Sequence, residues 1–291
     1  MASRKNNGSM QDALIVSLTS YGNRVNNIPV VLDTIFSQTV LPDGVVLNLA
    51  FEENVPDVVA EYLEEHKVEI NRVMDTRVYK KLIPTLIKYP EACVISIDDD
   101  FLYPKGMIED FVRIHEKYPN YPISGNRVVY FGMQCHCGCA SLTKAEFFGN
   151  YLHQLDAQTI TNCPSDDMLY TYFATKNGHP YVQTEKEYFI NMQGLNDGND
   201  KGYSDAINGD EGIVKSYDYL VNRFGLVDNV VSSYIHDDYM ARVIETIHRD
   251  NIWEVEDRIR SSRAYRIGKS ILKPFSWLNK RWFYDLHNHL F

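Results

Sequence analysis

The first hundred residues alternate repeatedly between short apolar runs and helix-like segments, and this alternation most restricts the fold. The expected strands are 13–18, 45–49, 68–73 and 93–97. The helices expected between them are 28–36, 58–65 and 82–87. The spacing of the apolar residues in 28–36 places them on one helical face. Strand–helix alternation of this kind predicts an α/β fold with a Rossmann-like, mostly parallel sheet that binds ligands at the carboxyl ends of its strands.

After residue 100 the alternation weakens. A helix is expected at 106–118 and a strand at 128–131, and Ser165 precedes a helix that Gly178 ends. The stretch 196–212 is rich in Gly, Asn and Asp and lacks hydrophobic periodicity, which in a compact domain usually marks a functional or disordered loop. The first strand is not followed by a G-x-G-x-x-G fingerprint, so a dinucleotide site of that type is not predicted.

Three consecutive aspartates, Asp98, Asp99 and Asp100, follow directly after the apolar run 93–97. Adjacent carboxylates repel one another, so holding them together is costly unless a cation neutralises them. Alternate residues of an extended segment face the same way, which lets Asp98 and Asp100 reach one ion. Oxygen ligands without thiolate or imidazole favour Mg²⁺ or Mn²⁺. The alternative is a solvated turn, which is less consistent with a place beside a buried strand.

The chain has five cysteines, an odd number that argues against a disulfide framework and fits a reducing compartment. Cys135, Cys137 and Cys139 lie in the string QCHCGCA, with His136 between them. Thiolate and imidazole are zinc ligands, but no C-x-x-C partner accompanies the string. Small buried thiols are the favoured interpretation, and a metal site is the alternative.

Three motifs occur in the order SLTSYGNR, YKKLIPTL and SIDDDFLYP. Together they resemble bacterial glycosyltransferases of the GT-A fold, in particular a group of capsule, O-antigen and lipopolysaccharide glycosyltransferases. The resemblance extends over residues 13–180. In that fold a D-x-D motif holds a divalent ion on the diphosphate of a nucleotide-sugar, so the resemblance implies metal ligation by Asp98 and Asp100.

The resemblance also implies which residues bind the donor. This set is Thr19, Ser20, Tyr21 and Arg24 at the nucleotide, Asp75 near the base or ribose, Lys80 or Lys81 near the diphosphate or sugar, and Asp98 and Asp99. For the lysines the alternative is a solvated helix face, and for Arg24 a helix-terminal charge.

An acidic pair, Asp166 and Asp167, opens the helix expected after Ser165. In inverting enzymes of this fold, a pair at this point supplies the base that takes a proton from the acceptor hydroxyl. The resemblance therefore implies Asp167 as base and Asp166 as the residue that orients it. Helix capping, worth about 0.3–1 kcal/mol, is a compatible alternative. His236 is a candidate third metal ligand, with a structural histidine as the alternative.

Charge divides the chain into a body, 1–257, and a tail, 258–291. The net charge is −10, yet the tail carries eight Lys and Arg against one Asp, which leaves −17 on the body. An acidic body argues against a nucleic-acid partner. Basic, aromatic and aliphatic residues in 258–282 favour contact with an anionic membrane surface. A helical hairpin packed on the catalytic domain and a homodimer contact are the alternatives.

The apolar runs are shorter than the roughly 18–20 residues of a membrane span, and the polar start lacks a signal peptide's apolar core. We therefore expect a cytoplasmic enzyme, peripheral on the inner face of the cell membrane. The predicted function is metal-dependent transfer of a hexosyl group from a nucleotide-sugar, with a UDP-sugar as the favoured donor. The expected acceptor is a saccharide or lipid-linked molecule in cell-surface polysaccharide synthesis. The 196–212 loop is hypothesised to close over the donor. The alternatives are a nucleotidyltransferase, and a non-catalytic sugar- or lipid-binding protein with a decayed site.

Overall fold

The computed structural model describes residues 12–126, 128–131, 133–136, 138–184, 186, 188, 193–195 and 210–227. All of them belong to one compact unit, Met1–Val243. The predictions for Cys137, for His236, for the boundary at residue 257 and for the tail lie outside the described residues. Within the described residues, helices are too short or too polar to cross a bilayer.

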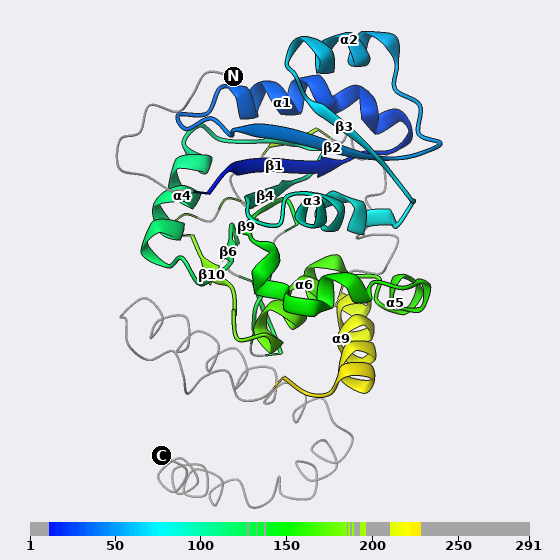
Figure 1. Cartoon of the computed structure of the whole chain (residues 1–291), viewed down its shortest axis with the longest axis vertical. Helices are drawn as coiled ribbons and strands as arrows, with labels where there is room; N and C mark the ends of the chain where they lie inside the picture. Colours follow the sequence, from blue (N-terminus) through cyan, green and yellow to red (C-terminus); the bar gives the residue numbers. More distant parts are fainter. Residues whose placement is uncertain are drawn as a thin grey trace, which may run out of the picture. The chain divides into compact units, whose positions relative to one another are not determined.

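Seven strands form the central sheet, in the order β10-β6-β9-β4-β1-β2-β3 (Figure 1). The strands are β1 (Leu14–Thr19), β2 (Gly44–Ala50), β3 (Glu69–Val73), β4 (Cys93–Ile97), β5 (Phe101–Leu102), β6 (Ile123–Ser124), β7 (Val129–Tyr130), β8 (Met133–Gln134), β9 (Ala140–Thr143), β10 (Val182–Gln183) and β11 (Gln193–Gly194). Neighbouring strands of the central sheet are parallel except where β9 pairs, antiparallel to both β4 and β6. The strand pairs β5–β11 and β7–β8 form two small antiparallel ribbons.

Helices cover both faces of the sheet, with α1 and α2 on one face and α3 and α6 on the other (Figure 1). The α-helices are α1 (Ile28–Phe36), α2 (Asp57–Glu65), α3 (Ile83–Lys88), α4 (Met107–Lys117), α5 (Ala157–Asn162), α6 (Asp166–Lys176) and α9 (Asp210–Phe224). The 3₁₀ helices are η1 (Gly22–Asn27), η2 (Arg77–Lys81) and η3 (Ala145–Gln154).

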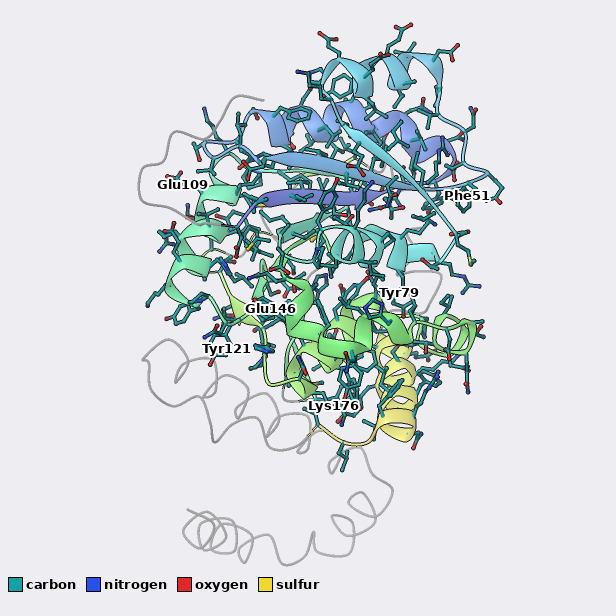
Figure 2. All side chains as sticks on the ribbon, viewed as in Figure 1. Phe51, Tyr79, Glu109, Tyr121, Glu146 and Lys176 are labelled. Carbon is teal, nitrogen blue, oxygen red and sulfur yellow. The ribbon has the colours of Figure 1, made fainter. Side chains whose placement is uncertain are left out.

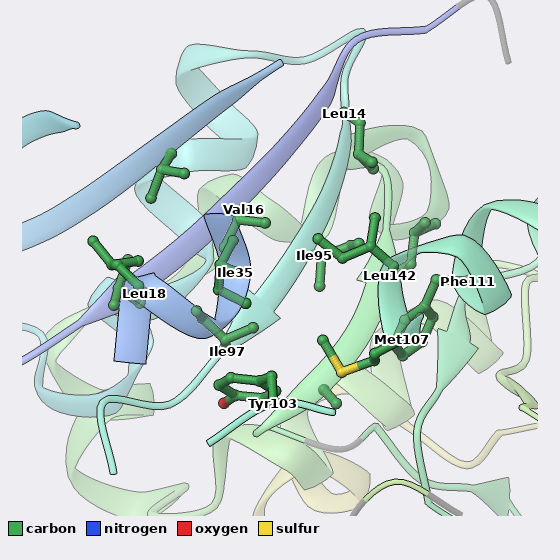
Figure 3. Close-up of a cluster of buried hydrophobic side chains, with 14 of the residues drawn as sticks. Leu14, Val16, Leu18, Ile35, Ile95, Ile97, Tyr103, Met107, Phe111 and Leu142 are labelled. Carbon is green, nitrogen blue, oxygen red and sulfur yellow. The ribbon is translucent and has the colours of Figure 1, made fainter. Parts of the chain in front are cut away.

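The alternation of side chains along each strand produces two apolar cores. Leu14, Val16 and Leu18 of β1 pack in the core that includes residues of α1 and α4, part of which is drawn in Figure 3. Ile15 lies on the opposite face, in the core with residues of α3 and α6. Burying an aliphatic side chain of this size contributes about 1.5–3 kcal/mol relative to exposure, so the two cores hold the helices onto the sheet.

The predicted α/β architecture is confirmed. The first four strands and the helices between them lie within one or two residues of their expected ends, and α4 and α6 lie where the sequence predicts helices. The segment expected as a strand at 128–131 contains β7, which pairs only with β8 and lies outside the central sheet. The prediction of a structureless stretch over 196–212 was wrong at its end, because α9 begins at Asp210; residues 196–209 lie outside the described residues.

The edge formed by the carboxyl ends of the parallel strands positions the candidate site. Register pairs Thr19 at the end of β1 with Asn48 of β2, so the segment after β1 leaves the sheet at the same edge as Asp98 after β4. Because β9 is antiparallel, its first residue, Ala140, pairs with Ile97, the last residue of β4. The segment that enters β9 therefore reaches the same edge.

Candidate active site

Buried polar side chains fix η2 to the sheet next to this edge. Ser17 Oγ donates to the carbonyl oxygen of Lys81 at 2.5 Å. Asn48 Nδ2 donates to Thr85 Oγ1 at 2.8 Å and to Ser17 Oγ at 3.1 Å. Ser17, Asn48 and Thr85 are fully buried, where a polar group must be hydrogen bonded to be tolerated. The backbone that carries Lys81 is therefore held firmly against β1 and β2.

The Lys81 ammonium joins the two acidic motifs. Its Nζ donates to Asp98 Oδ1 at 2.8 Å and lies 3.4 Å from Asp166 Oδ2. Burial works against the charged form of Lys81, but the charges of Asp166, Asp98 and Asp167 outweigh it and hold the pKa of Lys81 well above its usual value. The aspartates after β4 and those that open α6 are thus linked through one buried cation.

Gly138, on the segment that enters β9, packs against this charged group. A Cβ at this position would lie 2.6 Å from Lys81 Nζ and 3.0 Å from Asp167 Oδ1, so a larger residue would displace one of them. Asp167 Oδ1 and Asp166 Oδ2 are buried, and neither atom has a well-formed hydrogen bond to the described part of the chain. Burial and the charge of Asp166 raise the pKa of Asp167 well above its usual range, against the opposing effect of Lys81.

The other two aspartates after β4 bind the segment that follows β1. Asp99 is buried; it accepts a 2.5 Å hydrogen bond from Ser20 Oγ and forms an ion pair with Arg24. Arg24 Nη2 also lies 2.8 Å from Asp100 Oδ2. Burial raises the pKa of Asp99 to about 6, although Arg24 and Ser20 oppose the shift. The structure therefore brings the first and third sequence motifs together through Arg24.

The remaining residues expected at the donor lie around this group. Tyr21 is 47% exposed, and the Arg24 guanidinium lies 5.3 Å from the centroid of its ring. Thr19 Oγ1 donates to the carbonyl oxygen of Asn48 at 2.7 Å. Asp75 and Lys80 form an ion pair with each other, and the hydrogen bond from Lys80 lowers the pKa of Asp75.

Two contacts set the position of the α6 N-terminus. Ser165 is its N-cap, and its Oγ accepts from the backbone N–H of Met168 at 3.2 Å. The hydroxyl of Tyr79, labelled in Figure 2, donates to the carbonyl oxygen of Cys163. The element that carries Lys81 therefore also holds the segment leading to Asp166 and Asp167.

The residues at the end of β4 fit a divalent cation. Within the described residues, five carboxylates in the joined motifs, those of Asp98–Asp100, Asp166 and Asp167, face two cations, Arg24 and Lys81. The Asp98 side chain is 31% exposed, so solvent reaches it. Oxygen donors with surplus negative charge are what Mn²⁺ and Mg²⁺ require. The side chains that would hold such an ion are those of Asp98 and Asp100.

The cysteine string packs as buried structure where it is described. Cys135 and Cys139 are buried, and the His136 ring lies between the Tyr181 hydroxyl, 2.9 Å from Nδ1, and Ser96. Burial holds the pKa of His136 well below its usual value, so the ring is neutral. These contacts support the packing interpretation for the described residues of the string.

Sequence reasoning missed the residues that support the site. Ser17 and Asn48 had a usable signal, since each is a lone polar residue within an apolar strand and must find a buried partner. Tyr103, whose hydroxyl accepts from the backbone N–H of Asp98 at 2.8 Å, follows the aspartates in the third motif. Gly138 had no such signal, because its close approach to Lys81 depends on tertiary structure.

This chain is similar to known proteins in its structure rather than in its sequence. No protein family model matches the chain. No curated protein sequence matches it either. The mannosyltransferase PcManGT of Pyrobaculum calidifontis, solved with GDP-Man and Mn²⁺, has a TM-score of 0.57 at 15% identity over 90% of this chain and 84% of its own. Glucosyl-3-phosphoglycerate synthase of Mycobacterium tuberculosis, solved with Mn²⁺, UDP and phosphoglyceric acid, has a TM-score of 0.48 at 11% identity over 75% and 81%. The likeness to PcManGT and the order of the sheet establish the GT-A type of α/β fold.

Proposed function

We propose that this protein is a metal-dependent glycosyltransferase that moves a sugar from a nucleoside diphosphate sugar to an acceptor hydroxyl. The observation that carries the proposal is the buried Lys81 ammonium, which joins Asp98 after β4 to Asp166 at the start of α6. Metal-binding and proton-accepting carboxylates are thereby held at one edge of the sheet, where folds of this type bind ligands.

The segment after β1 suits the nucleotide. Arg24 is fixed by Asp99 and Asp100, and the half-exposed ring of Tyr21 lies beside it. We assign the nucleotide to this segment, with Thr19, Ser20 and Asp75 at its margin. When bound to Asp98 and Asp100, Mn²⁺ or Mg²⁺ supplies positive charge to the departing diphosphate. Lys81 adds a point charge on the same side.

Asp167 is the proposed base. Its pKa is raised by burial and by Asp166, and a carboxylate with a raised pKa is better matched to taking a proton near neutral pH. Its buried Oδ1 has no well-formed hydrogen bond to the described residues, and the backbone N–H of Gly138 only opposes the rise in the pKa of this carboxyl group. In the reaction, Asp167 takes the proton of the acceptor hydroxyl while Asp166 and Lys81 hold its position.

The donor and acceptor are proposed from the sequence motifs. UDP-hexoses are the first donors to test, and GDP-mannose belongs beside them because PcManGT was solved with GDP-Man. A saccharide or lipid-linked acceptor in bacterial cell-surface polysaccharide synthesis is consistent with the basic, aromatic segment 258–282, for which we propose contact with an anionic membrane. Salt-sensitive co-sedimentation with anionic but not neutral vesicles tests that contact, with a salt-independent dimer as the opposing result.

The test is release of nucleoside diphosphate from a panel of UDP- and GDP-sugars, with Mn²⁺ or after chelation. We expect one donor to be consumed by the wild type, and chelation to abolish the reaction. Asp167→Asn should lower turnover by about 10²-fold or more, in the range lost when an acid–base group is removed. Asp98→Asn should also lower turnover, because it removes a proposed metal ligand. The control is Asp57→Asn, at an exposed position on α2, which should retain activity.

Other outcomes separate the alternatives. Pyrophosphate release from a nucleoside triphosphate, without turnover of any sugar donor, would indicate a nucleotidyltransferase. Donor binding with no turnover, unchanged in Asp98→Asn, would indicate a binding protein. Either result would overturn the proposed function.

A further inference from the structure

A second group of potential metal ligands lies at the opposite edge of the sheet from the candidate active site. It consists of Asp12, Cys93 and His115, which come from three separate parts of the chain. Register pairs Cys93, the first residue of β4, with Leu14, the first residue of β1, so Asp12 lies at the same amino edge. His115 reaches it from the last turn of α4. The three donor atoms lie within 4.8 Å of one another.

The spacing of the sulfur and the imidazole fits one ion. Cys93 Sγ and His115 Nε2 are 3.4 Å apart. In a tetrahedral zinc site with Zn–S about 2.3 Å and Zn–N about 2.0 Å, neighbouring S and N ligands are separated by about 3.5 Å. The two side chains are therefore already at the separation that a shared zinc ion would impose.

The His115 ring has little else to stabilise it. It is 4% exposed, and its Nδ1 is buried without a hydrogen-bond partner among the residues that the structure describes. The Cys93 thiol is a weak partner for Nε2, the ring nitrogen that a zinc ion would bind.

The surrounding charges also balance a divalent ion. Lys144 Nζ lies 3.1 Å from Asp12 Oδ2 and 2.7 Å from Glu146 Oε1; Glu146 is labelled in Figure 2. On metal binding the Cys93 thiol gives its proton to solvent. The two charged ligands, the Asp12 carboxylate and the Cys93 thiolate, then carry −2, which a divalent ion neutralises. The Asp12 side chain is 37% exposed and provides a path from solvent.

We infer that Asp12, Cys93 and His115 form a zinc site that ties the starts of β1 and β4 to the end of α4. Cysteine, histidine and carboxylate are the ligand types that zinc takes in proteins, whereas the described ligands of the site at Asp98 are carboxylate oxygens. This site is separate from the proposed transferase centre and does not depend on the proposed function.

Cobalt replaces zinc as a spectroscopic probe in the test. The full-length protein is stripped with a chelator and titrated with Co²⁺, and the thiolate-to-cobalt charge-transfer band is recorded. We expect this band in the wild type, and its loss on addition of Zn²⁺. It should be absent in Cys93→Ser, and binding should weaken by about 10- to 100-fold or more in Asp12→Asn, whose partly exposed side chain is replaceable without loss of folding.

Two matched variants locate the thiolate. Cys163→Ser changes another buried thiol, and Cys135→Ser changes one in the cysteine string; both should retain the band. A Zn²⁺-dependent rise in unfolding temperature that Asp12→Asn removes gives a second readout. The inference is overturned if the wild type lacks the band, or if the band survives in Cys93→Ser or disappears in Cys135→Ser.

Discussion

Replacing Lys81 with methionine tests whether one buried cation holds the two acidic motifs together. The Lys81 side chain is 6% exposed and contacts Asp98 and Asp166, with Asp167 close enough to act on its pKa. Removing one partner of a buried ion pair costs about 3–5 kcal/mol, because the other partner is left uncompensated. We expect Lys81→Met to lower the free energy of unfolding by that amount at pH 8.

The loss should depend on pH with a definite sign. In Lys81→Met the carboxyl group of Asp167, whose folded-state pKa is already raised, loses the opposing effect of Lys81, so its pKa rises further above that of the unfolded chain. The folded state then binds more protons than the unfolded state, so stability falls as pH rises. The deficit of Lys81→Met relative to wild type is therefore smaller at pH 5 than at pH 8.

Urea unfolding followed by far-ultraviolet circular dichroism measures these differences. All three tryptophans lie at or beyond residue 253, so their fluorescence would report on a part of the chain distant in sequence from the site. The control is Lys88→Met, because Lys88 is 46% exposed and pairs with Glu69 at the surface. Exposed pairs are worth about 0–1 kcal/mol. A loss in Lys81→Met no larger than in the control, or equal at pH 5 and pH 8, would refute the reasoning.

Three further substitutions give separate checks by the same unfolding assay. Gly138→Ala places a methyl group 2.6 Å from Lys81 Nζ, so it should lower the free energy of unfolding by about 1–3 kcal/mol. It should also impair donor binding. The control is Gly44→Ala, which has open space around it and should leave donor binding intact. Ser165→Ala removes the N-cap of α6 and should cost about 0.5–2 kcal/mol; no loss would show that the cap is dispensable. Asp99 has a folded pKa of about 6, above its unfolded value, so its contribution to stability is lost as pH rises. Of this contribution, about 2 kcal/mol should be lost between pH 4 and pH 6. Asp99→Asn should flatten that slope, and an unchanged slope would assign it to other groups.

The elements that the sequence predicts well are those with strong local periodicity. The helix α1 buries Ile28, Val31, Leu32 and Ile35, the same residues whose spacing predicted it. The strand β9 was missed because it has only four residues, ASLT, of which Leu142 alone is large and apolar. It forms because β4 and β6 flank it on both sides, which is a property of the tertiary structure.

The candidate site divides in the same way. The aspartates at 98–100 were conspicuous because a charged run follows an apolar strand, and Asp166 and Asp167 because they open a helix. The sequence could not predict which cation pairs with each aspartate. Lys81 is distant in sequence from the α6 aspartates and contacts them because η2 holds it in a fixed position. Arg24 likewise meets Asp99 because β1 and β4 are neighbours in the sheet.

The antiparallel direction of β9 has a consequence for how this fold can change its ligand. At the carboxyl edge of the sheet, each parallel strand presents the residues that follow it. An insertion after such a strand therefore lengthens the loop that connects the strand to the next helix. At β9 the site is instead met by residues that come before the strand, with Gly138 two positions ahead of Ala140. The segment before Gly138 can therefore vary in length, while β9 fixes the position of this glycine at the site. Variation in ligand preference among chains of this kind is expected to concentrate on the amino side of this one strand, and on the carboxyl side of its neighbours.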